Sequence, residues 1–331
     1  MRTIRNCNVC VVGGAGFLGS HLVDHLIEDR QCNVLVIDNL EVGKVEFIHP
    51  KAKFYHHDIT GSEDVLHNLF KVSQIKYVFN YAARPYVPDS YDRPLRTFDV
   101  NTMGALKVIN AAQQAGVEAI LQVSSAELYG SQYNRSSGVS EETKVEPHST
   151  YGSAKAAIDS LIQVRWKEAQ TPCIALRQFN CVGERETHPY VIPEIISQLH
   201  QFNSYKEHTE VPTVKLGNNS RRDFMYAGDA VRSAVELLEN GQFGEVYNLG
   251  SEESIAIYDL AKLIGEIMGY SSIMIKEDES RKRKWEIWNL TSDNTKIYYL
   301  IKYRPTVTLR QALERTIYWF NLNGYKWAWE R

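Results

Sequence analysis

The segment that most constrains the fold lies near the amino terminus, where an apolar run ends in regularly spaced glycines. The run CNVCVVGG leads into the spacing Gly13-x-x-Gly16-x-x-Gly19, which opens a segment of helical periodicity, FLGSHLVDHLIED. Glycines permit a tight turn and a close approach of one backbone segment to another. The pattern therefore predicts a buried strand that turns sharply into a helix.

The alternation of strand and helix continues through the first half of the chain. Apolar runs such as NVLVIDN, IKYVFNYAA and AILQVSS alternate with helical segments, the longest of which span 95–116 and 149–170. Strands that alternate with helices predict a parallel sheet covered on both faces. We predict an α/β fold, a Rossmann-type doubly wound parallel sheet with a smaller carboxyl-terminal lobe that binds substrate. The predicted domains are residues 1–180, with 220–250 returning to them, and residues 181–331, which form mainly the smaller lobe.

Composition excludes several kinds of protein. Of the 331 residues, 44% are apolar and 23% are charged, which is typical of a globular protein with a substantial core. The formal net charge of −3 gives no reason to expect binding to nucleic acid or to a membrane surface. No apolar run approaches the roughly 20 residues that span a bilayer. The first residues lack the layout of a secretion signal, so we expect a cytoplasmic protein.

The five cysteines are expected to be reduced thiols. They are an odd number spread over a large chain, and the CxxC formed by Cys7 and Cys10 has no second Cys or His pair at zinc-finger spacing. We therefore predict no metal site.

The glycine turn and the strand after it together predict a dinucleotide site. The amino terminus of a helix favours the negative charge of a pyrophosphate. Asp38 ends the next predicted strand, about 20 residues beyond the glycines, where a carboxylate accepts hydrogen bonds from the adenosine ribose. The same carboxylate would repel a 2′-phosphate, so we predict NAD rather than NADP as the cofactor.

Tyr151 and Lys155 form a candidate acid–base pair. They stand four residues apart at the start of a predicted helix, so both side chains lie on one face. A free tyrosine has a pKa near 10, and activating it near neutral pH requires roughly 4 kcal/mol of preferential stabilisation of the phenolate. The ammonium of Lys155 and the positive nicotinamide ring could supply this in a partly dry site. Ser125, at the end of the strand AILQVSS, completes the group.

These motifs resemble those of the extended short-chain dehydrogenases/reductases, the nucleotide-sugar epimerase/dehydratase family. The resemblance extends over nearly the whole chain. Within it, Asp58 and Ile59 would bracket the adenine, and Asn101 would support the active-site helix. The cofactor-binding residues that it implies are Gly13, Gly16, Phe17, Leu18, Gly19, Asp38, Asn39, Leu40, Gly43, Asp58, Ile59, Ala82, Ala83, Asn101, Tyr151 and Lys155.

The resemblance also implies a chemistry. Ser125 would hydrogen-bond a sugar hydroxyl, and Tyr151 would remove its proton while the C4 hydride passes to NAD⁺. Lys155 would hold the ribose and tune Tyr151. In this family the hydride is usually returned to the product, so the net redox change is zero, and we expect an isomerase, lyase or decarboxylase.

Glu127 directs the prediction towards 4,6-dehydration. It stands two residues after Ser125, at the position where the glucose and mannose 4,6-dehydratases carry Glu and where simple 4-epimerases typically lack a carboxylate. A base there could remove the C5 proton, which a 4-keto group acidifies, before the C6 hydroxyl leaves. One residue departs from this pattern, because Ala126 stands where thymidine-diphosphoglucose dehydratases have the Asp that serves as the acid.

The later segments HPYVIPEIISQL, RRDFMYAGDAV and SRKRKWEIWNLTSDNTK resemble dehydratase relatives that act on nucleotide-linked hexoses. Arg222 and Arg283 in these segments are expected to bind the diphosphate, because guanidinium matches phosphate oxygens. The helices at 95–114 and 150–169 resemble those that pair in a homodimer, which we also expect here. The site implied for a nucleotide-diphosphate sugar consists of Arg84, Ser125, Asn180, Val191, Pro193, Arg222 and Arg283.

The leading prediction is an NAD-dependent nucleotide-sugar 4,6-dehydratase, a lyase. A nucleotide-sugar 4-epimerase and a UDP-glucuronate decarboxylase are the alternatives within the family, and the decarboxylase loop also carries a hydroxyl-x-Glu pattern. A non-catalytic NAD-binding regulator is the alternative of another class. The presence of Ser125, Tyr151 and Lys155 together argues against that regulator.

Overall fold

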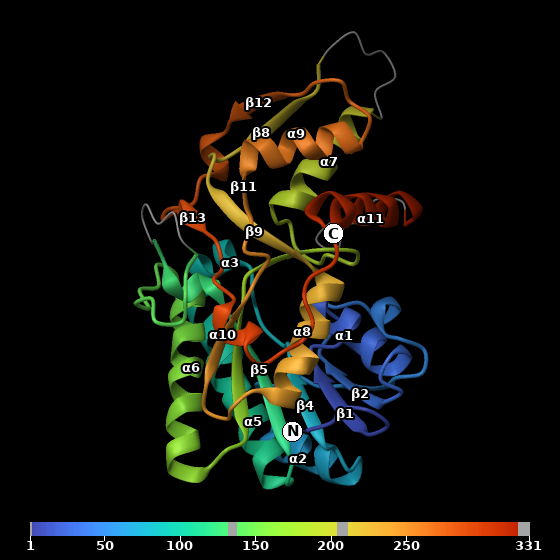
Figure 1. The fold of residues 1–331 in the computed structure, drawn as a ribbon, viewed down its shortest axis with the longest axis vertical. Coiled ribbons are helices and arrows are strands. Elements are labelled where there is room, and N and C mark those ends of the chain that lie inside the picture. The colour runs from blue at the N-terminus through green and yellow to red at the C-terminus, as the bar shows by residue number, and fades with distance from the viewer. Residues whose placement is uncertain (1, 132–137, 204–210, 324–331) are drawn as a thin grey trace.

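A seven-stranded parallel sheet forms the centre of a large α/β body, and a smaller lobe lies above it (Figure 1). The computed structural model describes residues 2–131, 138–203 and 211–323. The sheet has the strand order β10-β6-β5-β4-β1-β2-β3, which confirms the predicted Rossmann-type α/β fold. Its strands are β1 (Asn8–Val12), β2 (Asn33–Asp38), β3 (Lys53–His56), β4 (Tyr77–Asn80), β5 (Ala119–Ser125), β6 (Cys173–Gln178) and β10 (Val246–Leu249).

Helices cover both faces of this sheet. They are α1 (Phe17–Glu28), α2 (Glu63–Val72), α5 (Ala105–Gln114), α6 (Thr150–Ala169) and α8 (Ala227–Asn240). The apolar faces of α1 and α8 share one core cluster with the sheet, and those of α2, α5 and α6 share another. Because successive strand residues point to opposite faces, Val9 and Val11 join the first cluster, whereas Cys10 and Val12 join the second.

The smaller lobe is made mainly from the later part of the chain. Its elements are β7 (Asn180–Val182), α7 (Val191–Asn203), β8 (Thr213–Leu216), β9 (Arg221–Tyr226), β11 (Ser254–Ala256), α9 (Ile257–Ile267), β12 (Met274–Glu277), β13 (Asn289–Leu290) and α11 (Leu309–Leu322). β9 pairs with β7, β11 and β13, while β8 and β12 form a separate parallel pair. The helices enclose a third core cluster that includes Ile195, Leu260 and Phe320.

Several short elements complete the fold, and the structure departs from the sequence-based expectation at one of them. They are η1 (Val45–Phe47), α3 (Val87–Asp92), α4 (Pro94–Phe98), η2 (Asp99–Gly104), η3 (Ala126–Tyr129), η4 (Glu279–Arg281) and α10 (Thr295–Tyr298). We expected one continuous helix from residue 95, but α4 and α5 are joined by η2, which is a π-helix. A π-helical turn is wider than an α-helical turn and often occurs beside a functional site.

The segment 220–250 is divided between the body and the lobe. β9 lies in the small sheet, whereas α8 packs beside α1 and β10 forms the edge of the large sheet. Farther along, α10 packs on β10, and Ile297 and Ile301 join the first core cluster. The chain thus crosses between the two parts more than once, and the domain boundary near residue 180 stays a prediction.

The cysteines are free thiols; Cys10, Cys32 and Cys173 are buried, and Cys7 and Cys181 are partly buried. Within the described residues, no three His, Cys, Asp or Glu side chains gather as metal ligands. In the same part of the chain, no helix has the length and apolar character needed to cross a membrane.

Candidate active site

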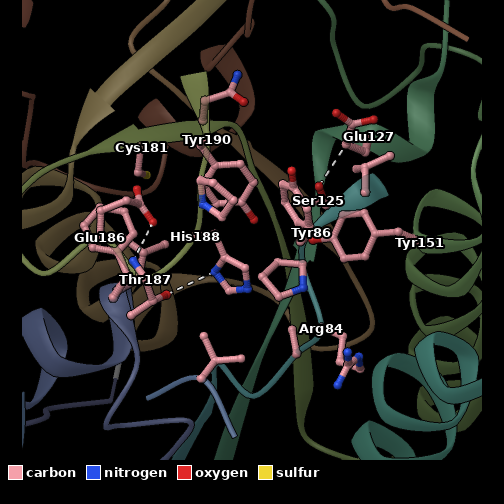
Figure 2. A pocket seen from close by; sticks show the side chains of 18 of the residues that line it. Arg84, Tyr86, Ser125, Glu127, Tyr151, Cys181, Glu186, Thr187, His188 and Tyr190 are labelled. Carbon is pink, nitrogen blue, oxygen red and sulfur yellow. Dashed lines mark hydrogen bonds between the residues drawn. The ribbon is translucent and has the colours of Figure 1, made fainter. Parts of the chain in front are cut away.

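A cleft of about 860 Å³ lies at the carboxyl ends of the parallel strands, below the smaller lobe. Its walls come from the ends of β1, β2, β4 and β5, and from the loops that follow β7 and η4. Side chains from both the body and the lobe point into it (Figure 2). Ligands of open parallel sheets bind at this end of the strands, so the cleft is the candidate site.

The glycine turn forms one end of the cleft and has no room for side chains. Gly13 has a φ of 81°, and a Cβ on it would lie 2.5 Å from the amide nitrogen of Ala82. A Cβ on Gly19 would lie 2.0 Å from the carbonyl oxygen of Gly13. No described side chain caps the first turn of α1, which begins at Phe17. The free amides of that turn suit the pyrophosphate of a dinucleotide.

Asp38 ends β2 beside this turn. One carboxylate oxygen accepts a hydrogen bond from the amide of Ala15 at 3.0 Å, and the other accepts from the amide of Leu40 at 2.8 Å. Burial raises the pKa of Asp38, and the bonds from these amides oppose the rise. The amides hold the carboxylate in one position, and each oxygen keeps a lone pair for a ribose hydroxyl.

Most of the predicted cofactor residues line the cleft, but Leu40 and Asn101 do not. Leu40 has a φ of 56°, and its backbone amide donates a hydrogen bond to the carboxylate of Asp38. Asn101 is buried on η2, where its side-chain amide donates to the carbonyls of Thr97 and Arg84 at 2.9 and 3.1 Å. Both residues therefore support the wall. The residues that line it are Gly13, Gly16, Phe17, Leu18, Gly19, Asp38, Asn39, Gly43, Asp58, Ile59, Ala82, Ala83, Tyr151 and Lys155.

Ser125, Tyr151 and Lys155 come together in the middle of the cleft. Ser125 ends β5, while Tyr151 and Lys155 lie on one face of α6, whose first turn is capped by the hydroxyl of Ser149. Ser125 and Tyr151 hydrogen-bond each other through their hydroxyls. The Nζ atom of Lys155 lies 5.8 Å from the centre of the Tyr151 ring and donates to the carbonyl of Val123 at 2.9 Å. The three predicted residues thus form one group.

Burial dominates the electrostatics of this group. It raises the pKa of Tyr151 above its usual range, although the hydrogen bond with Ser125 opposes the rise. Burial also lowers the pKa of Lys155 to about 8, although the negative charge of Asp159 opposes the fall. We expected Lys155 to lower the pKa of Tyr151, but the protein groups alone keep this tyrosine protonated.

A buried ion pair between Arg177 and Asp159 lies next to Lys155, and the sequence analysis did not predict it. Arg177 donates from Nε to the carboxylate of Asp159 at 2.8 Å, and the two side chains are 5% and 3% exposed. Arg177 also donates to the hydroxyl of Tyr129, which donates to Asn248, both at 2.7 Å. The spacing of Lys155 and Asp159, one helical turn apart, was the available sequence signal.

Glu127 lies in the cleft on η3, directly after β5. Its amide donates to the hydroxyl oxygen of Ser125 at 3.2 Å (Figure 2). Arg283 donates from Nη1 to the Glu127 carboxylate at 3.2 Å. The arginine that we predicted for the diphosphate thus pairs with the candidate base. Their side chains are 28% and 17% exposed, so a ligand can reach both.

The other two predicted arginines line the cleft and are paired as well. Arg222 is buried, and its guanidinium donates to the carboxylate of Glu286 at 2.6 Å. Arg84 forms ion pairs with Glu41 and Asp89. A ligand would therefore meet arginines whose charges are already balanced by carboxylates.

The remaining predicted substrate residues line the same cleft. Asn180 begins β7, and its side-chain amide donates to the carbonyl of Asp223 at 3.2 Å. Val191 and Pro193 lie in the first turn of α7. Their roles in binding a sugar nucleotide stay predictions.

The loop from β7 to α7 adds lining residues that the sequence analysis did not single out. They are Glu186, His188 and Tyr190, and Tyr86 from the loop after β4 lies beside them (Figure 2). The ring of His188 stacks on Tyr86 with centroids 6.0 Å apart and lies 5.4 Å from the Tyr190 ring. Burial lowers the pKa of His188 to about 4, so the ring is neutral. In the sequence, the run THPY at residues 187–190 was the only sign that polar and aromatic side chains gather in this loop.

The dinucleotide cradle and the Ser–Tyr–Lys group define a class, the extended short-chain dehydrogenases/reductases with a Rossmann-type fold. The chain belongs to the GDP-mannose 4,6 dehydratase family, whose sequence profile matches residues 10–316. The resemblance stated from the sequence is thereby confirmed.

Relatives with two activities resemble this chain. The human dTDP-D-glucose 4,6-dehydratase is 30% identical over 330 residues, which cover 96% of this chain and 91% of the relative. The structure of UDP-glucose 4-epimerase from Thermotoga maritima, solved with UDP-glucose, is 29% identical, with a TM-score of 0.83 over 96% of this chain and 99% of the epimerase. The structure of dTDP-glucose 4,6-dehydratase from Streptomyces venezuelae, solved with NAD, is 25% identical, with a TM-score of 0.85 over 97% and 98% of the two chains. These comparisons place the protein among the enzymes that are nucleotide-sugar dehydratases and epimerases.

Proposed function

We propose that the protein is an NAD-dependent nucleotide-sugar 4,6-dehydratase, and hence a lyase. The observation that carries the proposal is the position of Glu127, a carboxylate in the same cleft as Ser125 and Tyr151. Oxidation at C4 requires a base for the C4 hydroxyl, and elimination requires a second base for the C5 proton. Tyr151 and Glu127 would fill these two roles.

The cofactor is NAD, as the sequence predicted. The Streptomyces venezuelae dehydratase was solved with NAD. In the present chain the side-chain-free turn at Gly13 and Gly19 and the carboxylate of Asp38 fit a dinucleotide with an unmodified ribose. The chemistry that bound NAD supplies is reversible acceptance of hydride, together with a positive charge near Tyr151.

The oxidation step would use the Ser–Tyr–Lys group. Ser125 would hold the C4 hydroxyl, and Tyr151 would take its proton, since the two side chains already hydrogen-bond each other. Lys155 would hold the ribose and stabilise the phenolate. Asp159 faces Lys155 and helps it to keep its charge at neutral pH.

The elimination step would use Glu127. It would remove the C5 proton of the 4-keto sugar, and the same proton would then pass to the C6 hydroxyl as it leaves as water. Ala126 offers no acid for this transfer, so one carboxyl group would take and return the proton. Arg283 donates to Glu127 at 3.2 Å and would have to release it for the carboxylate to reach C5.

A nucleotide-sugar 4-epimerase is the second candidate, and Ala126 is the observation that favours it. This residue is 2% exposed and provides no acid where thymidine-diphosphoglucose dehydratases have one. A UDP-glucuronate decarboxylase is supported only by the hydroxyl-x-Glu pattern of Ser125 and Glu127. A regulator without activity is disfavoured by the intact Ser–Tyr–Lys group.

Mass spectrometry of the products from a panel of nucleotide sugars tests the proposal. Incubation of the NAD-loaded protein with UDP- and dTDP-hexoses should give a product that has lost one water. An unchanged mass with altered stereochemistry would show epimerisation, and loss of carbon dioxide from UDP-glucuronate would show decarboxylation. Either of those results would replace the proposal.

We also propose a homodimer that forms through α4, η2 and α6. These elements carry large apolar side chains that are exposed in the single chain, including Leu95 at 86%, Met103 at 46% and Val164 at 41%. Light scattering on dilute protein would give twice the mass of the chain, and a monomer would contradict the proposal. The cytoplasmic location stays a prediction.

A further inference from the structure

The loop between β7 and α7 carries a buried carboxyl group that the proposed reaction does not use. Glu186 is 6% exposed and lines the cleft. Arg185, just before it, has a left-handed φ of 64°, and its guanidinium binds Asp24 of α1 at 2.7 Å. This turn holds Arg185 against the body, while the side chain of Glu186 points into the cleft (Figure 2).

The surroundings of Glu186 favour its uncharged form. Its Oε1 atom accepts a hydrogen bond from the amide of Thr187 at 3.1 Å, and the amide of His188 also contributes. Among the described residues, no side chain hydrogen-bonds Glu186 and no Lys or Arg forms an ion pair with it. Burial raises the pKa of Glu186 to about 8. A neutral carboxyl group can both donate and accept a hydrogen bond.

The arginines around the cleft are bound to other carboxylates. Pairing one of them with Glu186 would therefore break an ion pair that already exists. The pairs are Arg283 with Glu127, Arg222 with Glu286, and Arg281 with Glu194.

Aromatic rings lie between Glu186 and the reacting groups. His188, Tyr86 and Tyr190 occupy the space between Glu186 on one side and Tyr151 on the other (Figure 2). The Tyr190 hydroxyl is close enough to interact electrostatically with both Tyr151 and Glu186. A hexose that offers its C4 hydroxyl to Tyr151 can lay its ring against these aromatic groups and direct another substituent towards Glu186.

We propose that Glu186 is a specificity-determining residue that binds an uncharged polar substituent of the hexose, on the side of the sugar away from Tyr151. The inference rests on the proposed function, because it requires a nucleotide sugar in this cleft. Hydroxyl and acetamido groups each offer a donor and an acceptor, which a neutral carboxyl group matches. A hexuronate would place a second acidic group beside Glu186, so hexuronates are disfavoured.

Calorimetric binding to the NAD-loaded enzyme tests this role. A Tyr151→Phe background prevents turnover, so that UDP-glucose, UDP-N-acetylglucosamine, dTDP-glucose and UDP-glucuronate can be compared with UDP and dTDP, which lack the sugar. Glu186→Met keeps the length of the side chain without its hydrogen bonds, and Glu186→Gln keeps a donor and an acceptor. Glu184→Gln is the matched control, since Glu184 lies in the same loop but lines a different pocket.

We expect Glu186→Met to lower the affinity for the preferred uncharged nucleotide sugar about 10- to 100-fold and to leave the affinities for UDP and dTDP unchanged. Glu186→Gln and Glu184→Gln should stay within about threefold of the parent enzyme. The proposal would be overturned if Glu186→Met lost the same affinity for ligands with and without the sugar. It would also be overturned if this variant lost affinity only for NAD, or if it lost no affinity at all. So would binding of UDP-glucuronate as tight as that of UDP-glucose.

A second measurement covers the case in which Glu186→Met does not fold. Affinity for the sugar nucleotide should fall as pH rises through about 8 when Glu186 is present, and the Glu186→Gln variant should lack this fall. Cys181 and Tyr190 face Glu186 with pKa values raised by burial, and the pKa of His188 lies near 4, so none of them titrates in this range. Lys155, whose pKa is about 8, is present both in the parent protein and in Glu186→Gln, so its titration affects both profiles alike. Parallel pH profiles would contradict the role of Glu186.

The same set of proteins separates this inference from the proposed function. If the enzyme with Tyr151 intact turns over no nucleotide sugar, the proposed function fails. If it dehydrates a nucleotide sugar while Glu186→Met binds that sugar normally, only the role of Glu186 fails.

Discussion

The two walls of the cleft are held in place by different kinds of contact. In the body wall, Asp38, Ser125 and Lys155 bond to backbone groups at the ends of strands. In the lobe wall, Arg283 is held by the side chain of Glu127, which is distant in the sequence and partly exposed. Backbone contacts fix a side chain at one position, whereas a partly exposed ion pair can exchange one partner for a ligand. We therefore expect the body wall to determine the chemistry and the lobe wall to determine which substrate binds.

Tyr151→Phe should give the largest effect, because it removes the only hydroxyl proposed to take the C4 proton. We expect kcat to fall about 10³- to 10⁴-fold while NAD stays bound. Product formation measured by mass spectrometry gives kcat, and cofactor content gives NAD binding. Tyr258→Phe, outside the cleft, is the matched control and should behave like the wild type. A near-normal kcat in Tyr151→Phe would show that Tyr151 is not the acid–base group.

Asp159→Leu should cause the largest loss of stability, because it leaves Arg177 buried without its partner. Removing one member of a buried ion pair typically costs about 3–5 kcal/mol of the free energy of unfolding. Urea unfolding measures the loss. Adding Arg177→Met should restore part of it, since the unpaired charge is then removed as well. Equal losses in the single and double variants would show that the pair does not act as a unit.

Glu127→Gln should lower the rate of dehydration about 10²- to 10³-fold but spare oxidation at C4. Reduced cofactor should then accumulate and be detected by its absorbance, because the hydride is not returned when elimination stops. Glu142→Gln, on an exposed loop, is the control for the loss of a carboxylate. Full dehydratase activity in Glu127→Gln would assign the C5 base to another group.

The stability of the protein should also depend on pH through Glu186. Its pKa in the folded protein, about 8, lies above its ordinary value of 4.5. The stability that the neutral group contributes is therefore complete below about pH 4.5 and is lost as pH rises towards about 8. Relative to Glu186→Gln, the free energy of unfolding should fall by at most about 1.4 kcal/mol per pH unit across this window. Urea unfolding at a series of pH values measures it, and parallel curves would mean that Glu186 is solvated.

The body wall could be predicted from sequence because its residues are close together in the chain or follow strands directly. The glycine spacing, Asp38, and the four-residue spacing of Tyr151 and Lys155 are each fixed by local geometry. The exceptions, Leu40 and Asn101, lie where the backbone leaves regular structure, one at a positive φ and the other in a π-helix. Periodicity in the sequence does not reveal such local departures.

The lobe wall could be predicted only in part. The basic segment suggested that Arg283 binds phosphate, but Arg283 and Glu127 are 156 residues apart, and their pairing depends on how the lobe folds over the body. The pattern around Glu186 shows a carboxylate in a polar loop, and its burial is evident only from the folded structure. Charge pairing and burial are tertiary properties, so the arrangement of the lobe wall was the least predictable from sequence.

If Arg283 binds the diphosphate as predicted, its ion pair with Glu127 would make substrate binding an exchange of one anion for another. The diphosphate would then compete with the Glu127 carboxylate, and each nucleotide that entered would release one carboxylate. Under the proposed mechanism, Glu127 would be free to act as a base only in enzyme molecules that already hold a nucleotide. Because salt weakens the displaced pair and the new pair alike, the affinity for a sugar nucleotide should respond less to ionic strength than it would at an unpaired arginine.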